Sequence, residues 1–459
     1  MNCLTGVCAR IGLIVAAFAA PGRADETSWQ AGWSSTVVTP ESSMWMAGFG
    51  NRTEPSDGTL HDLRIRVLAL QDADGHRGVL VAGDLLGIPK SIYDNVCERL
   101  FDECGLHRSQ VMLNSSHTHN SPVLRGALLD VYPLDDAELQ KIEDYSTWLE
   151  TKIVETVGEA LERMEPVELY RGEGDCGFST DRQWDQEDAL VHNVPVLAVR
   201  SLDGELKVVV MTYACHPTSL KNSGWLYGEY ATLLQKWSPD FPQFAVARVE
   251  SNHPGAMAMF TQGCGGDRSA PQEGRLEKTE EIGALLGLAV EEVLSGSMRK
   301  IEPRLRTSLR LIELPFGDAP TTDYLTEQLQ QTGGNTFLAR WADRLLEQRK
   351  TGRRLATSYP EFPVQVWRLG ENEFWVSLGG ETVSGYSIAI REQIAPGATV
   401  FGYTNDVMAY IPTPEIIQQG QYIGHSSMAV YGLPTMRWQE GIQEQILGTV
   451  RELVDDVSE

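Results

Sequence analysis

The chain is poor in cysteine, and the cysteines it has do not form a recognisable framework. After Cys8 they are few, odd in number and widely scattered: Cys97, Cys104, Cys176, Cys215 and Cys264. Such a set does not make the disulfide scaffold of a small secreted domain. No Cys-x-x-Cys pair is present either, so nothing indicates a thiolate-bound metal.

An excess of positive charge is also lacking, because the formal net charge is -25 and the isoelectric point is near 4.8. Nucleic acids and anionic membrane surfaces would be repelled at long range, so we expect no nucleic-acid partner. A smaller basic rim is still compatible with this charge, so a lipid substrate stays open. With 459 residues, 42% of them hydrophobic, the chain can bury the core of one large or two tightly joined domains.

Long hydrophobic runs are absent, and the one apolar stretch near the N-terminus has the pattern of a secretory signal peptide. Arg10 precedes the run Ile11–Ala20, which small residues and an acidic turn follow. The run is shorter than the roughly 20 apolar residues that span a bilayer. We expect a signal peptide at 1–24, a mature chain at 25–459, and a secreted or periplasmic protein with no transmembrane segment and at most peripheral membrane contact.

Short runs rich in Val, Ile and Leu alternate with stretches whose apolar residues recur every three or four positions. The runs predict strands at Leu63–Leu70, Gly78–Ala82, Gln110–Leu113, Val194–Val199, Lys207–Tyr213 and Phe374–Leu378, with a weaker candidate at Ala256–Gln262. The periodic stretches predict helices at Ser91–Glu103, Ala137–Met164, Leu276–Val293 and Arg437–Val457. This alternation predicts a mixed α/β (α+β) fold, a layered central mixed sheet flanked by helices, in a single large domain. Residues 316–322, FGDAPTT, are expected to form a surface loop and not a linker.

Two histidine motifs directly follow predicted strands. In NSSHTHNSP, His117 and His119 face the same side about 6.6 Å apart if the extended backbone continues. In YACHPTSL, His216 lies at a fixed turn, because Pro217 ends the strand ladder there. Ligand sites commonly form at such strand ends. The alternative for each histidine is a structural residue that is hydrogen-bonded within its loop.

Three further motifs place polar side chains beside tight turns. FTQGCGGDRSAP leads through Gly-rich backbone to Asp267 and Ser269, and it could also be a plain tight connection. LGGETVSGYS places Glu381 at the predicted first turn of a helix, where a carboxylate could simply favour the helix dipole. The segment GYTNDVMAYIPTPEIIQQGQYIGHSS presents Tyr410 and Tyr422, and tyrosines in such loops are more often packed than catalytic.

Taken together and in this order, the motifs resemble those of the neutral, or non-lysosomal alkaline, ceramidases over most of the mature chain. The resemblance implies one zinc ion per chain. Its ligands would be His117 of SSHTHNSP, His216 of ACHPTS, Glu381 of GGE and Tyr410 of NDVMAYIPT. His119 corresponds to the second active-site histidine of the family.

The same resemblance implies three further active-site residues. Tyr422 matches a later tyrosine of the family, and Arg182 in STDRQW is a loose counterpart of its Asn-Arg-Ser-Pro segment, both as oxyanion or substrate contacts. Ser269 is in register with the serine assigned as nucleophile in the family's GDVSPN, although the segment here reads GDRSAP. Full-length ceramidases also carry a C-terminal immunoglobulin-like domain that has no counterpart here, so we expect the catalytic domain alone.

The predicted function is a zinc-dependent amidohydrolase of sphingolipid or lipid metabolism, which hydrolyses the N-acyl amide bond of ceramide or a related N-acyl lipid. We expect zinc-activated water to attack, His119 to act as acid and base, and Asp267 to orient a histidine. Ser269 would then bind substrate or hold its loop. The alternatives are a zinc hydrolase of a different amide or ester, and a non-catalytic zinc-stabilised binding protein, in which the metal site would be closed.

Overall fold

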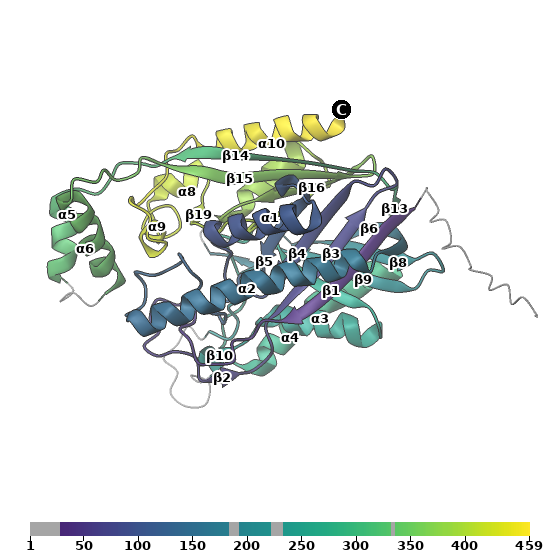
Figure 1. The fold of residues 1–459 in the computed structure, drawn as a ribbon, viewed down its shortest axis with the longest axis horizontal. Coiled ribbons are helices and arrows are strands. Elements are labelled where there is room, and N and C mark those ends of the chain that lie inside the picture. The colour runs from purple at the N-terminus through teal and green to yellow at the C-terminus, as the bar shows by residue number, and fades with distance from the viewer. Residues whose placement is uncertain (1–27, 183–191, 222–232, 332–335) are drawn as a thin grey trace, which may run out of the picture.

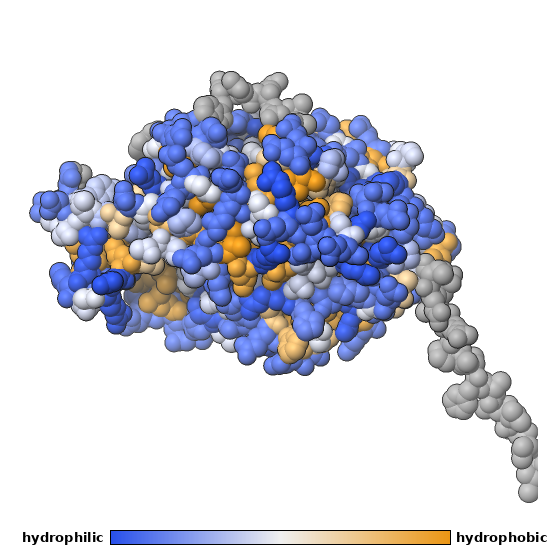
Figure 2. Space-filling model, turned by 90° about the horizontal axis from the view of Figure 1, so that it is seen from above, coloured by the Kyte–Doolittle hydropathy of each residue, from blue (hydrophilic) through white to orange (hydrophobic). Residues whose placement is uncertain are grey.

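The computed structural model describes residues 28–182, 192–221, 233–331 and 336–459. The expected signal peptide, 1–24, lies outside these residues and stays a prediction. Within the described part of the chain, no helix combines the length and the apolar character needed to cross a membrane. The face of the molecule in Figure 2 is mainly hydrophilic, with smaller hydrophobic areas between the polar ones.

A nine-stranded mixed sheet is the largest layer of the described structure (Figure 1). Its strands run in the order β11-β9-β8-β6-β1-β3-β4-β5, and β13 also pairs with β6. Their bounds are β1 (Trp29–Val37), β3 (Arg64–Gln71), β4 (Arg77–Gly83), β5 (Val111–Ser115), β6 (Glu165–Asp175), β8 (Asn193–Ser201), β9 (Leu206–Tyr213), β11 (Met257–Gln262) and β13 (Arg299–Ile301). The pairs β4–β5 and β9–β11 are parallel, whereas β1, β3, β6 and β8 pair antiparallel with their neighbours.

Successive side chains of a strand point to opposite faces of the sheet. Helices cover one of these faces, and a second sheet covers the other. In β8, Val196 and Ala198 join the core under two helices, while Leu197 and Val199 face a second sheet. The covering helices are α1 (Lys90–Cys104), α2 (Asp136–Glu162), α3 (Phe241–Asn252) and α4 (Leu276–Ser295). The first two pack over β3, β4 and β5, and the last two over β8, β9 and β11.

The second sheet has the strand order β14-β15-β16-β18 and packs against the open face of the first. Its bounds are β14 (Leu305–Pro315), β15 (Ser358–Leu369), β16 (Glu373–Leu378) and β18 (Thr399–Phe401). Trp367, Trp375 and Phe401 fill the space between the two sheets. The outer face is covered by α7 (Ser384–Gln393) and α10 (Ile442–Ser458), and Figure 1 shows α10 lying across it. The molecule therefore has four layers, helix, sheet, sheet and helix, and the predicted α/β architecture is confirmed.

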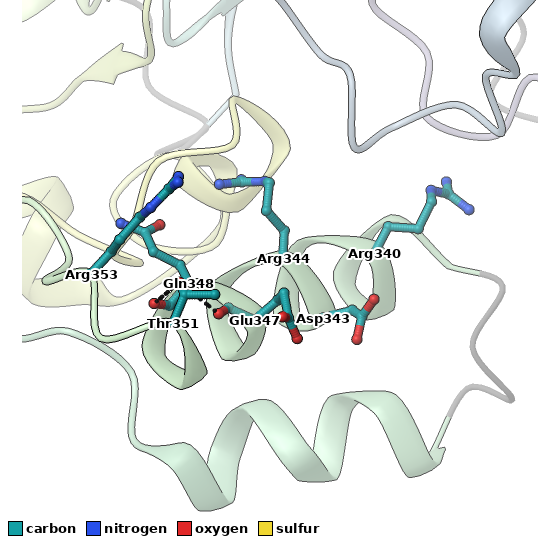
Figure 3. Close-up of a pocket in the computed structure, with 7 residues that line it drawn as sticks. All are labelled: Arg340, Asp343, Arg344, Glu347, Gln348, Thr351 and Arg353. Atoms are coloured by element: carbon teal, nitrogen blue, oxygen red, sulfur yellow. Dashed lines mark hydrogen bonds between the residues drawn. The ribbon is translucent and has the colours of Figure 1, made fainter.

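Two helices between β14 and β15 project from one end of the molecule (Figure 1). These are α5 (Thr322–Gln331) and α6 (Phe337–Lys350), and the strands that flank them pair up to Pro315 and Ser358. Residues 316–322 thus lead from a strand into this insertion, as a loop and not a linker. Along α6 lies a hollow of about 650 Å³ (Figure 3). It is lined by charged and polar side chains of α6 and of the turn after it, among them Arg344, which is paired with Asp130, and not by any of the predicted site residues.

The remaining elements are short. They are β2 (Gly58–Thr59), η1 (Arg108–Gln110), β7 (Thr180–Asp181), β10 (Lys236–Trp237), β12 (Arg268–Ser269), β17 (Glu381–Thr382), β19 (Tyr410–Ile411), α8 (Pro414–Gln419) and α9 (Ser427–Val430). All the predicted strands are present with slightly shifted ends, and the weaker candidate is β11. The last helix begins at Ile442 and not at the expected Arg437, because Trp438 forms a bridge with Phe316 and Gly441 is the N-cap.

A buried carboxyl group makes the stability of this fold depend on pH. Asp406 lies in the loop before β19, where its Oδ2 accepts a hydrogen bond from Tyr359. Burial is the largest influence and raises the pKa of Asp406 from 3.8 to about 7, although Tyr359 and Lys90 act to lower it. The pKa of Asp406 is higher in the folded state than in the unfolded state, so folding favours the protonated carboxyl group. Its contribution to the free energy of unfolding is therefore complete below the unfolded-state pKa of 3.8 and is lost as the pH rises through the folded-state pKa of about 7.

We therefore expect the free energy of unfolding of the wild type to fall relative to Asp406→Asn as the pH rises from about 5 to about 7, by up to about 1.4 kcal/mol per pH unit. Denaturant unfolding of both proteins at several pH values measures this difference. Parallel curves for the two proteins would contradict it.

Candidate metal centre

The two edge strands of the first sheet, β5 and β11, approach each other at their C-terminal ends although they are last and first in the strand order. Asn114 of β5 joins them: its Nδ2 donates to Gln262 O at 3.1 Å, and its Oδ1 accepts from Gln262 N at 2.8 Å. The same Nδ2 donates to Gly402 O, just after β18, at 2.9 Å. One side chain thus draws the loops after β5, β11 and β18 together, at the seam between the two sheets.

His117 follows β5 in a left-handed backbone conformation, with φ of 66°. Its backbone N–H donates to Leu85 O at 2.9 Å, and its Nδ1–H donates to Leu86 O at 2.6 Å. The imidazole is buried. Because Nδ1 carries the proton, the Nε2 lone pair faces the site, which is the usual arrangement for a metal-binding histidine.

His216 follows β9 and is fixed in the same way by the Gly-rich loop. Its Nδ1–H is shared between Gly265 O at 2.8 Å and Arg268 O at 3.0 Å. A side chain at Gly266 would lie 2.5 Å from Glu381 O, so only glycine allows this loop to approach that residue closely. The GCGGD loop therefore orients His216 through its carbonyl groups and seats it beside Glu381.

Glu381 and Tyr410 lie side by side in the parallel pair β17–β19. The expectation that Glu381 begins a helix is wrong, because its N–H donates to Ala409 O at 2.7 Å in strand pairing, and α7 begins only at Ser384. Gly380, with φ of 67°, makes the preceding turn. The pairing of β17 with β19 therefore sets the direction of the Glu381 carboxylate, and the dipole of α7 does not.

The four expected ligands converge although they are far apart in the sequence. Glu381 Oε2 lies 3.1 Å from His117 Nε2 and 3.0 Å from His216 Nε2. All three atoms are acceptors when Nδ1 holds the imidazole proton, so their approach is repulsive unless a cation lies among them. The Tyr410 hydroxyl is 3.3 Å from His216 Nε2. Ligands about 2.0 to 2.2 Å from a tetrahedral zinc stand about 3.3 Å apart, so these residues fit that ion.

The electrostatics of the site agree with this donor set. Burial would raise the pKa of Glu381, but a proton on the facing His117 or His216 would hold it well below its usual value. Burial and the adjacent Arg182 lower the pKa of His216 to about 4. Burial, His117 and His216 likewise lower the pKa of His119 well below its usual value. The carboxylate and the neutral imidazole are the protonation states in which these groups bind metals.

His119 belongs to the same cluster but is held differently. Its Nε2 lies 3.3 Å from His117 Nε2, and one nitrogen from each of the three histidines falls within 4.8 Å of the others, so this buried group could hold a metal ion. Its Nδ1, in contrast, has no hydrogen-bond partner in the described part of the chain. The Phe49 ring packs against the imidazole at 4.6 Å, and Arg52 Nη2 donates to His119 O at 2.7 Å.

The ring of His119 rests on Gly48, which has φ of 99°. A side chain there would lie 2.5 Å from His119 Cγ. In the metal-dependent hydrolase that the sequence predicts, Gly48→Ala should displace the imidazole and lower turnover by about 10- to 100-fold at unchanged metal content. Gly126→Ala is the matched control, because Gly126 also has a positive φ, of 81°, and a side chain there would meet Ser91 Oγ at an ordinary 3.8 Å. Kinetics and elemental analysis of both variants measure the effect, and equal turnover would contradict it.

Arg182 and Tyr422 also reach this region. Arg182 Nη1 lies 3.2 Å from His216 Nε2 and donates to the Tyr410 hydroxyl at 3.4 Å. The Tyr422 ring is 5.8 Å from that of Tyr410. Because 45% of the residue is exposed, Tyr422 lies at the solvent end of the cluster.

Ser269 and Asp267 have other partners. The Ser269 hydroxyl donates to Ala270 O at 3.3 Å and accepts from Gln272 at 3.4 Å, and no imidazole of the described residues is hydrogen-bonded to it. Asp267 does not orient a histidine as expected: its two carboxylate oxygens accept from Ser384 N and Oγ, both at 2.7 Å. It thereby fixes the start of α7, just after Glu381.

Two tyrosines that the sequence motifs did not single out contact the same carboxylate. The Tyr431 hydroxyl donates to Glu381 Oε1 at 2.5 Å. Tyr403 packs against His117 with ring centroids 4.4 Å apart, and its hydroxyl is 3.5 Å from Glu381 Oε2. Tyr403 stands within the segment GYTND, so its place in a motif with other site residues could have identified it. Tyr431, in AVYGLP, follows the last motif and carries no such signal.

Fold and cluster together define the class of structure: two stacked sheets between helices, with a His/Glu/Tyr cluster where loops of both sheets meet. Among solved structures, neutral ceramidase from Pseudomonas aeruginosa has this fold, with a TM-score of 0.72 and 18% identity over 94% of this chain and 75% of that chain. A structure described as ceramidase complexed with C2 is similar, with a TM-score of 0.71 and 18% identity over 93% and 75%. No protein-family model matches the chain, and no curated protein matches it significantly. The resemblance read from the motifs is thus confirmed for the fold.

Proposed function

We propose that this chain is a zinc-dependent amidohydrolase that cleaves the N-acyl amide bond of ceramide or of a related N-acyl lipid. The observation that supports this best is the approach of His117 Nε2 and His216 Nε2 to Glu381 Oε2, at 3.1 and 3.0 Å, from loops of both sheets. The names of the structures with the same fold suggest the substrate class. When bound, zinc supplies a Lewis acid that polarises a carbonyl group and makes water more acidic.

In this proposal the chain holds the ion through four side chains, His117, His216, Glu381 and Tyr410. The two imidazoles are kept in one tautomer by Nδ1–H bonds to backbone carbonyls. Such outer contacts raise the basicity of the ligands and fix their direction. Tyr410 takes its direction from strand pairing with Glu381.

His119 would carry the proton. Its Nε2 faces the cluster at 3.3 Å from His117 Nε2, and its pKa is lowered by burial, so it enters the reaction as a base. It would take a proton from the attacking water and pass it to the amide nitrogen as the C–N bond breaks, which leaves a carboxylic acid and an amine. Tyr422 and Arg182 would donate hydrogen bonds to the carbonyl oxygen as it becomes negative.

We also propose that the protein is exported after removal of residues 1–24, and that residues 25–459 form a catalytic domain of lipid metabolism. The charge pattern around Ile11–Ala20 supports export. N-terminal sequencing of the protein recovered from outside the cytoplasm would test both boundaries.

The same arrangement of side chains is compatible with two other functions. A different amide or ester could be the substrate, because one fold and one metal set host several hydrolytic reactions. The departure of GDRSAP from the ceramidase motif would also suit a zinc-stabilised binding protein that has lost turnover.

One combined experiment separates these outcomes: elemental analysis of the purified protein, followed by a mass-spectrometric screen of N-acyl lipids, peptides and acylated sugars. We expect about one zinc per chain and release of fatty acid from an N-acyl lipid. Turnover of another class alone would support the first alternative, and zinc without any turnover the second. A protein that binds no metal would contradict the proposal as a whole.

A further inference from the structure

The two oxygens of the Glu381 carboxylate face different groups. Oε2 points to the imidazoles of His117 and His216. Oε1 points the other way and accepts a hydrogen bond of 2.5 Å from Tyr431. The whole carboxylate is buried, with 2% of the residue exposed.

The bond to Tyr431 has the features of a strong one. A hydroxyl that donates to a carboxylate typically lies about 2.5 to 2.7 Å away and contributes about twice as much as a bond between neutral groups. Among the described side chains, Tyr403 is the other hydroxyl donor to Glu381, and it stands 3.5 Å from Oε2, at the limit of a hydrogen bond. Tyr431 is therefore the principal fixed partner of Oε1.

The position of Tyr431 is set by packing from several directions. It is the C-cap of α9, with its N–H directed to Ser427 O. Its ring packs against the core under α1 and α2 and also against the core between the second sheet and α10. A donor held from both sides can fix the rotation of the carboxylate that it contacts, which a mobile side chain could not do.

We propose that Tyr431 is a positioning residue of the metal centre: it pins Glu381 Oε1 and thereby directs Oε2 alone to the ion between the histidines. This rests on the proposed function. Without the hydroxyl, Oε1 becomes a buried acceptor with no partner, and the carboxylate is free to turn away from the imidazoles. Outer-shell partners of this kind typically change metal affinity by about 10- to 100-fold.

The test is Tyr431→Phe, which removes one oxygen atom and keeps the ring. We expect its zinc dissociation constant, measured by competition with a chromophoric chelator, to rise by about 10- to 100-fold. The matched control is Tyr145→Phe, because Tyr145 lies on α2 and its hydroxyl donates to Val38 O at 2.6 Å, at a buried place away from the cluster. It should lose a similar bond and leave the zinc affinity within about twofold.

A double-mutant cycle separates positioning from general loosening. In a Glu381→Gln background the charge that Tyr431 holds is gone, so adding Tyr431→Phe should change zinc affinity much less than it does in the wild type. The thermal midpoint of the metal-free protein should fall by similar amounts for Tyr431→Phe and Tyr145→Phe. Equal zinc affinity in the wild type and Tyr431→Phe would overturn the inference. Absence of zinc binding by the wild type itself would instead remove the proposed function.

Discussion

Purified His216→Ala is expected to bind zinc at least about 100-fold more weakly than the wild type and to retain no measurable turnover. Loss of an outer-shell contact alone costs about 10- to 100-fold in metal affinity, and His216 would be a direct ligand. The variant also leaves Glu381 Oε2 with one imidazole instead of the two at 3.0 and 3.1 Å. Glu381→Ala should have the same outcome, because the remaining ligands are then neutral.

The chain offers a close control for this experiment. His253, the C-cap of α3, also pairs with a glutamate: its Nε2 lies 2.9 Å from Oε2 of Glu291 on α4, away from the cluster. His253→Ala should keep full zinc and full turnover. Elemental analysis and chelator competition on the three variants give the measurement, and full zinc in His216→Ala and Glu381→Ala would rule out the ligand assignment.

Substitution of His119 should separate chemistry from metal binding. We expect His119→Ala to lower kcat by about 10²-fold or more while zinc content stays at the wild-type level, because it loses the group that moves the proton. His117 and His216 each have a fixed Nδ1–H bond to a carbonyl, whereas Nδ1 of His119 has no partner among the described residues. Loss of zinc in His119→Ala would show that it is a ligand.

Ser269 is the matched comparison, because the family resemblance and the geometry point to different roles. Its hydroxyl contacts Ala270 O and Gln272, not a base, so Ser269→Ala should reduce turnover only modestly. Tyr422→Phe, by contrast, should cost about 10²-fold if its hydroxyl stabilises the oxyanion. Steady-state kinetics at equal zinc content measure all three variants. An acyl group trapped on Ser269, together with near-complete loss of activity in the alanine variant, would make it the nucleophile.

The sequence predicted those parts of the structure that depend on local pattern. Apolar runs located the buried strands of the first sheet, and three- and four-residue periods located α1, α2 and α4. It indicated a strand-like stretch before residue 316, where β14 ends, but it did not predict β15, although the run from Phe362 to Trp367 is buried. Pro363 and Gln365 interrupt the apolar residues of that run, so pairing with β14 and β16 defines the strand more than its hydrophobic pattern does.

The site was predictable where ligands follow strands and not where long-range packing selects them. His117 and His216 stand directly after strands, so spacing and neighbouring residues identified them. The Gly-Gly pair ends the preceding strand, so the sequence predicts a helix that begins at Glu381, whereas pairing with Tyr410 holds Glu381 in a short strand. Tyr431 reaches Glu381 only through the docking of α9, and no local pattern encodes that contact.

The seam between the sheets has a consequence for how the molecule is assembled. His117 and His216 follow strands of the first sheet, whereas Glu381 and Tyr410 follow strands of the second sheet. An ion held by all four would therefore link the N-terminal and C-terminal halves of the chain. Contacts between residues so distant in sequence raise the contact order and slow folding. In the proposed zinc enzyme, the ion would be captured only after the two halves dock, and its affinity would then add to the resistance of the native state to opening along the seam.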